Sequence, residues 1–166
     1  MSARILGVDP GARRIGLALD DEASGAMALP HGVVERGMDD QAAAKKVKDA
    51  LGELELSVAV VGLPLRLDGT EGTAARRARR FGVALEAALG VPVEYWDERL
   101  TTVAAERTLR EMGVRGQKQR RVVDETAAAI LLQGYLDARE YQRGAGSSSA
   151  GEAAGDEAWR DDDGDG

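Results

Sequence analysis

The sequence predicts an α/β fold built on a mixed β-sheet, and three observations lead to this prediction. Apolar residues in the first 35 positions run continuously or alternate with small and polar ones, as in three consecutive strands. Gly, Pro and Asp separate these runs and indicate tight turns. Two further apolar runs then alternate with segments of helical periodicity. This order favours an antiparallel meander extended by right-handed parallel crossovers.

Residues 5–20 are expected to form the first two strands and the turn between them. The apolar run over residues 5–8 is typical of a strand buried on both faces. Pro10 and Gly11 favour a turn, because proline fixes φ and glycine tolerates positive φ. Asp9 therefore lies where the backbone reverses, and its carboxylate is either a turn former or a ligand.

The remaining elements follow from the same signals. A third strand over residues 27–35 contains Pro30 and Gly32, which favours an edge position. The elements expected after it are a helix from Asp39 or Asp40 to about Gly52, a buried parallel strand over 57–61, a helix over 73–89 capped by Thr73, a strand over 91–96, a helix from Thr101 or Thr102 to Gly113, and a last helix from Asp124 to about Tyr141.

Length and charge indicate one folded domain with an acidic extension. The chain has 166 residues and a net charge of -7, and its length is enough for one domain with a real core. Residues 144–166 hold seven acids and one arginine in a Gly/Ser/Ala/Asp-rich segment. We predict that residues 1–143 fold and that residues 144–166 are a disordered acidic tail. The near-neutral domain can then bind a polyanion through local basic clusters.

Composition also limits the chemistry. The sequence has no cysteine and one histidine, His31, which excludes thiolate zinc sites and paired-histidine metal motifs. A bound metal would be held mainly by oxygen, which favours Mg²⁺ or Mn²⁺. No apolar run is long enough to span a bilayer, and no secretion signal precedes the first strand. A cytoplasmic protein without a membrane partner is expected.

Acidic residues are predicted to meet at one edge of the sheet. Asp9 follows the first strand, and Asp97 and Glu98 follow the last one. Asp124 opens the last helix on the face that should pack on the sheet. The carboxyl ends of parallel strands meet at one edge, where ligands usually bind. If the last strand continues, Asp97 and Glu98 point to opposite faces, so either could join Asp9. Together such acids could hold a metal ion that assists attack on a phosphodiester.

Each acid also has an ordinary structural role. Asp9 could form the turn, Asp124 could cap its helix, and Asp97 and Glu98 could pair with neighbouring bases. Asp20 is expected to be solvated. Their joint position at one edge is what favours function.

Basic and hydroxyl groups near these acids are candidates for binding a phosphate backbone. The loop before Asp124 is basic, although it could simply be solvated. The candidates are Arg14, Arg99, Thr101, Thr102, Arg115, Lys118, Arg120 and Arg121. Thr101 and Thr102 could instead be plain helix caps. Four arginines of the predicted helix over 73–89 spread over more than one face, which favours a solvated surface, and His31 is expected at the surface.

Four motifs, in order and in spacing, resemble the YqgF/RuvX family. They are GVDPG followed by RIG over residues 7–16, VGLP followed by DGT over 61–70, DERLTT over 97–102, and VDE with its apolar positions over 123–131. Members of this family are Holliday junction resolvase-like proteins, also described as pre-16S rRNA nucleases. The likeness covers roughly residues 4–140 and leaves the tail outside.

The resemblance implies an RNase H-like fold with a five-stranded sheet in the order 3-2-1-4-5. It further implies phosphodiester hydrolysis that depends on a divalent metal, Mg²⁺ or Mn²⁺. The family's active-site acids fall on Asp9, Glu98 and Asp124, with Asp97 adjacent. The implied substrate is the 5′ end of the 16S rRNA precursor, in a ribosomal precursor particle, and the implied enzyme is a monomer or weak homodimer.

Three other functions fit parts of the sequence. A resolvase of branched DNA would keep the fold and work as a two-fold dimer. The turn around Asp9 also resembles the phosphate-binding hairpin of actin-like ATPases and sugar kinases, which need two such domains where this chain has room for one. An RNA-binding assembly factor without catalysis is the fourth hypothesis, although the full set of acids favours an enzyme.

Overall fold

The computed structural model describes residues 3–100 and 126–144. Its elements are β1 (Arg4–Pro10), β2 (Arg14–Asp20), β3 (Ala28–Glu35), α1 (Asp40–Leu51), β4 (Leu56–Leu63), α2 (Thr73–Leu89), β5 (Val93–Asp97), the 3-10 helix η1 (Glu98–Leu100) and a helix over 126–144. None of the helices in these two ranges is long and apolar enough to cross a membrane.

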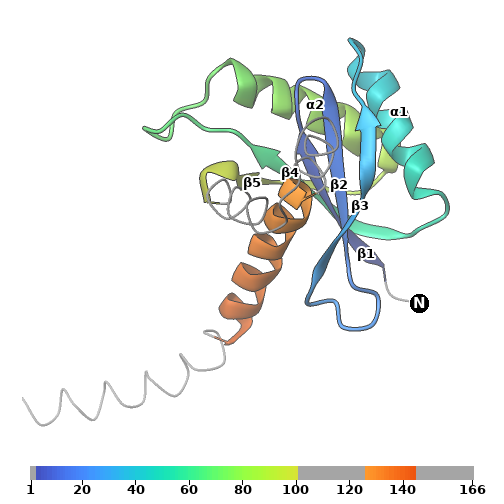
Figure 1. Cartoon of the computed structure of the whole chain (residues 1–166), viewed down its shortest axis with the longest axis vertical. Helices are drawn as coiled ribbons and strands as arrows, with labels where there is room; N and C mark the ends of the chain where they lie inside the picture. Colours follow the sequence, from blue (N-terminus) through green and yellow to red (C-terminus); the bar gives the residue numbers. More distant parts are fainter. Residues whose placement is uncertain (1–2, 101–125, 145–166) are drawn as a thin grey trace, which may run out of the picture.

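The five strands form one sheet in the order β3-β2-β1-β4-β5 (Figure 1). β1 pairs antiparallel with β2, and β2 pairs antiparallel with β3. β4 lies parallel to β1 and to β5. This confirms the mixed sheet, its predicted order and the edge position of the third strand. The carboxyl ends of β1, β4 and β5 consequently lie side by side.

Alternate side chains along each strand point to opposite faces of the sheet, so the core has two layers. Leu6 and Val8 of β1 point into a cluster with α1 and α2. Ile5 belongs to the opposite cluster, which includes Leu131 and Leu132 of the 126–144 helix. In Figure 1, α1 and α2 pack together, and the 126–144 helix, in orange, lies apart from them. Each face of the sheet thus has its own helical cover, as expected for a sheet with parallel strands buried on both faces.

A glycine lets the 126–144 helix approach β1 closely. A Cβ atom added to Gly7 would lie 2.7 Å from the Cβ of Leu132 and 3.1 Å from the carbonyl oxygen of Ala128. At the other end of the sheet, the amide of Gln133 accepts a hydrogen bond from Ala28 N and donates one to Ala26 O. The helix therefore runs from the strand end that carries Asp9 toward the β2–β3 turn.

Most predicted boundaries agree with the structure, and two differ. Asp39 caps α1 by accepting a hydrogen bond from Gln41 N, as expected. The N-cap of α2 is Gly72 rather than Thr73, which is the first helical residue. β4 extends through Gly62 to Leu63, beyond the strand predicted over residues 57–61. That extension matters below, because it makes Gly62 a strand residue beside β1.

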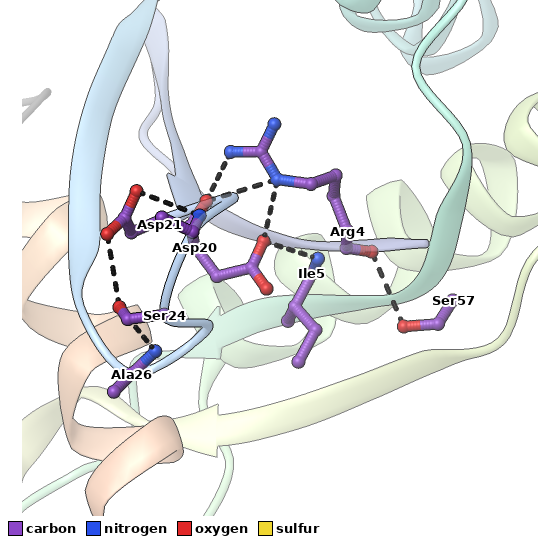
Figure 2. A network of polar contacts seen from close by, with 8 residues as sticks. Arg4, Ile5, Asp20, Asp21, Ser24, Ala26 and Ser57 are labelled. Carbon is purple, nitrogen blue, oxygen red and sulfur yellow. Dashed lines mark hydrogen bonds and ion pairs between the residues drawn. The ribbon is translucent and has the colours of Figure 1, made fainter. Parts of the chain in front are cut away.

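Asp20 is buried rather than solvated. The residue is 7% exposed, and its side chain is ion-paired to Arg4, with 3.1 Å between Oδ1 and Nε. Ile5 N also donates a 2.9 Å hydrogen bond to Oδ1, and Figure 2 shows both contacts. The sequence prediction was wrong because Asp20 ends β2 beside the start of β1, where the antiparallel pairing brings Arg4 against it. The nearby Asp21 bonds instead to Ser24 within the β2–β3 turn.

Replacement of Asp20 by alanine is expected to lower the free energy of unfolding by about 2–4 kcal/mol, because it leaves the Arg4 charge and the Ile5 amide without their shared acceptor. Urea denaturation followed by circular dichroism measures this change. Asp21→Ala is the matched control and should change stability by about 0.5 kcal/mol or less. Equal losses in the two variants would contradict the structural role of Asp20.

Candidate active site

The candidate site lies at the shared carboxyl edge of the three parallel strands. β1 ends in Asp9 and Pro10, and β5 ends in Asp97, immediately before Glu98. β4 lies between them, with Gly62 in register with Trp96. An acid at the end of β1 and one after β5 can therefore meet only by reaching across the end of β4.

The side chain of Glu98 crosses the end of β4 by passing over Gly62. A Cβ atom on Gly62 would collide with Oε1 of Glu98 and would lie 2.5 Å from Cδ1 of Leu131. The glycine therefore opens the space in which the Glu98 side chain lies, between β4 and the 126–144 helix. Asp9 lies four residues after Ile5 on β1, so the two side chains point to the same face of the sheet. A glycine inside an apolar strand is a recognised sign of such close approach, and the sequence analysis gave Gly62 no role.

The carboxyl groups of Asp9 and Glu98 are hydrogen-bonded to each other. Burial, this hydrogen bond and the negative charges of Asp9 and Asp97 raise the pKa of Glu98 to about 9. Two acids held together in a partly buried site cannot both ionise easily, so the neutral form of Glu98 is favoured. This is a typical feature of functional carboxylate pairs.

Asp97 has a different environment. Its carboxylate forms an ion pair with Arg99, at 2.6 Å between Oδ2 and Nη2, and accepts a hydrogen bond from Arg99 N. Hydrogen bonding to Arg99 lowers the pKa of Asp97. Arg99 also donates to the carbonyls of Arg66 and Leu67. Glu98 therefore faces Asp9, while Asp97 and Arg99 tie the β4–α2 loop to the end of β5.

Of the predicted basic residues, Arg14 lies on the same face of the sheet as Asp9. Asp9 is the register partner of Gly16 across the β1–β2 pair, and Arg14 is two residues before Gly16. The Nε atom of Arg14 is 3.7 Å from Oε1 of Glu35. This Nε is buried and has no hydrogen-bond partner within the described residues.

Arg36 is a functional candidate that the sequence analysis missed. It is 4% exposed, donates to Gly11 O at 3.0 Å, and pairs with Asp40 at 3.0 Å. Its guanidinium also lies over the ring of Phe81. Arg36 therefore fixes the turn that follows Asp9 against α1 and α2. A single arginine after an edge strand carried no signal, since its burial depends on two helices distant in sequence.

The remaining predicted site residues lie outside the described ranges. They are Thr101, Thr102, Arg115, Lys118, Arg120, Arg121 and Asp124. Among the residues that are described, no group of three or more His, Cys, Asp or Glu side chains could hold a metal ion. The pair of Asp9 and Glu98 is thus the part of the predicted acidic cluster that the structure brings together.

Comparison with solved structures identifies the class of fold. The chain superposes on "T. thermophilus RuvC in complex with Holliday junction substrate" with a TM-score of 0.51 and 18% identity, covering 84% of this chain and 96% of that one. The shared architecture, with strands in the order 3-2-1-4-5, is RNase H-like. The fold predicted from the family resemblance is therefore confirmed.

Sequence comparison identifies the family. Residues 3–138 match the family described as "RuvX: Holliday junction resolvase". A relative from Anaeromyxobacter dehalogenans (strain 2CP-C) is 52% identical over 136 residues, which cover 82% of this chain and 98% of the relative. Another from Syntrophus aciditrophicus is 44% identical over 84% of this chain and 92% of the relative. Both are named "Putative pre-16S rRNA nuclease". The chain belongs to the RuvX family.

The raised pKa of Glu98 predicts a pH-dependent difference in stability between the wild type and Glu98→Gln in EDTA. The pKa of Glu98 is about 9 when folded and about 4.3 when unfolded. Between these values the folded state binds a proton that the unfolded state lacks, so this group lowers stability as pH rises. Glutamine is neutral throughout, so Glu98→Gln should become progressively more stable than the wild type from pH 5 to about 9. Urea denaturation across this range measures the difference.

Glu86→Gln, in an exposed position on α2, is the matched control. Its difference from the wild type should stay nearly constant with pH above 5. A constant difference for Glu98→Gln as well would show that the pKa of Glu98 is not raised in the folded protein.

Proposed function

We propose that this protein is a metal-dependent nuclease that hydrolyses RNA phosphodiesters, with the 5′ end of the 16S rRNA precursor as its substrate. The observation that carries the proposal is the contact between Asp9 and Glu98 at the carboxyl edge of β1, β4 and β5. Membership of the RuvX family and the names of its relatives support the nuclease class and the RNA substrate. Action on ribosomal precursor particles in the cytoplasm is part of the proposal.

The residues present fit a hard divalent cation. Two carboxyl groups in contact, one with a raised pKa, form a site where a cation would displace the proton of Glu98. Their oxygen donors suit Mg²⁺ or Mn²⁺. Asp9 and Glu98 would hold such an ion, which would activate water and stabilise the leaving oxygen. Asp97 is the weaker candidate ligand, because Arg99 already pairs with it.

Asp124 is proposed as the third acid. It precedes the 126–144 helix by two residues, and Ala128 of that helix lies against Gly7 in β1. Gly7 is two residues before Asp9 on the same face of the strand. This packing supports an approach of Asp124 to the pair, where it would add a further oxygen ligand.

Basic and hydroxyl groups are proposed to hold the RNA backbone around the acids. Arg14, on the same face as Asp9, would donate hydrogen bonds to phosphate oxygens. Arg99 would bind beside the end of β5, held in place by Asp97. Flanking phosphates would be bound by Thr101, Thr102, Arg115, Lys118, Arg120 and Arg121.

The proposal divides the chain into a folded domain and a tail. Residues 1–143 form the nuclease domain, and residues 144–166 are an acidic tail. The described helix reaches residue 144, at this boundary. The enzyme is proposed to act as a monomer or weak homodimer.

Asp9→Asn is expected to lower the rate of metal-dependent cleavage of a 16S precursor RNA about a thousandfold, because it removes a charged ligand worth several kcal/mol in the transition state. The assay follows the labelled RNA on gels with Mg²⁺, Mn²⁺ or EDTA. Asp49→Asn makes the same change at an exposed position on α1 and should keep wild-type activity. Cleavage by Asp9→Asn at the wild-type rate would refute the assignment, and RNA binding without turnover in any metal would favour a non-catalytic assembly factor.

A second candidate function is cleavage of four-way DNA junctions. It is favoured by the family description, Holliday junction resolvase. A resolvase cuts two strands symmetrically and normally requires a two-fold dimer.

We expect the purified protein to cleave precursor rRNA and to leave a four-way DNA junction intact under the same metal conditions. Light scattering with and without the junction should show no junction-induced dimer. Paired symmetric cuts in the junction, together with a dimer on it, would instead establish the resolvase function.

A further inference from the structure

Three arginines of α2 form an exposed basic surface. Arg76, Arg77 and Arg80 are all exposed, and spacings of three and four residues make Arg80 a neighbour of the other two. None of the three forms an ion pair with another described residue. We call these three residues the α2 arginine surface.

Arg79, the fourth arginine of α2, differs from these three. It pairs with Glu71, at 2.6 Å between Nε and Oε1, and its guanidinium lies 4.8 Å from the centre of the Tyr95 ring. The expectation that the four arginines spread over more than one face is therefore correct. The structure adds that three of them stay together and form no ion pair with a described residue.

Arg36 places the α2 arginine surface beside the candidate active site. Nη1 of its guanidinium donates to Gly11 O at 3.0 Å, and Nη2 donates to Arg77 O at 3.4 Å. A single buried guanidinium thus contacts both α2 and the turn that begins just after Asp9. The surface therefore begins at the same edge of the sheet as the acidic pair.

We propose that the α2 arginine surface binds phosphate groups of the RNA beyond the cleavage position. This inference rests on the proposed nuclease function and extends it to a second contact region. Residues 1–143 are nearly neutral, because most of the net charge of -7 lies in residues 144–166. Three adjacent guanidiniums without an ion pair therefore form a local basic cluster. Guanidinium groups suit phosphate oxygens through paired hydrogen bonds. An RNA strand bound at Asp9 and Glu98 would present its further phosphate groups along this same edge of the sheet.

The test removes the three charges in Arg76→Ala/Arg77→Ala/Arg80→Ala. Binding of a fluorescently labelled RNA stem-loop with a single-stranded 5′ extension is measured by anisotropy in EDTA over a series of salt concentrations. Each lost phosphate contact lowers the slope of log K against log salt by about 0.7 on single strands. The slope should therefore fall by about 2, which makes binding at 0.1 M salt roughly a hundredfold weaker. An unchanged slope overturns the proposal.

Two control variants separate a local contact from a change in net charge or in folding. Lys45→Ala/Lys46→Ala/Lys48→Ala removes three exposed charges from neighbouring α1 and should leave the slope close to wild type. Arg76→Lys/Arg77→Lys/Arg80→Lys keeps the charges and should restore most of the slope. An equal loss in the α1 lysine variant would show a general charge effect and would also overturn the proposal.

Comparison with Asp9→Asn separates this inference from the proposed function. If Asp9→Asn is inactive while the triple arginine variant binds RNA as the wild type does, the nuclease function stands and the α2 arginine surface is not an RNA contact. If Asp9→Asn cleaves normally while the triple variant loses salt-dependent binding, the surface stands and the catalytic assignment falls. Thermal unfolding of each variant confirms that it is folded.

Discussion

The site depends on one unfavourable contact that the fold enforces. Asp9 and Glu98 come from strands separated by β4, and their carboxyl groups meet at the sheet edge. The strands cannot move apart to relieve this repulsion, since their register is fixed by apolar packing on both faces. Burial, the hydrogen bond to Asp9 and this repulsion together raise the pKa of Glu98, and binding of a cation would favour its ionised form. The stability of the core is thus what keeps the acids ready for a metal.

Small residues give this contact its space. Gly62 leaves room for Glu98 above the end of β4, and Gly7 lets the 126–144 helix lie directly on β1. The same helix contributes Leu131 beside Glu98, so an apolar side chain adjoins the acidic pair. This packing limits water around the Glu98 carboxyl group and strengthens its interaction with Asp9. Helix packing and the electrostatics of the site therefore have a common origin in two glycines.

Arginines serve two purposes at the same edge. Arg36 and Arg99 have acidic and carbonyl partners, and each fixes a loop beside the acids. Arg76, Arg77 and Arg80 form no ion pair within the described residues and remain available to an anion. Composition alone does not separate these classes. The distinction depends on which guanidiniums the folded backbone surrounds with acceptors.

Periodicity and turn residues in the sequence determined the described strands and helices and the mixed sheet, because these follow from local spacing of apolar residues. The helix predicted from Thr101 or Thr102 to Gly113 lies outside the described residues. Motif order pointed to Asp9 and Glu98. Tertiary structure decided that Glu98 rather than Asp97 faces Asp9, that Asp20 is buried against Arg4, and that Arg36 fixes the turn after Asp9. Each depends on neighbours distant in sequence, since a side chain's partners and burial are set by the packing of whole elements.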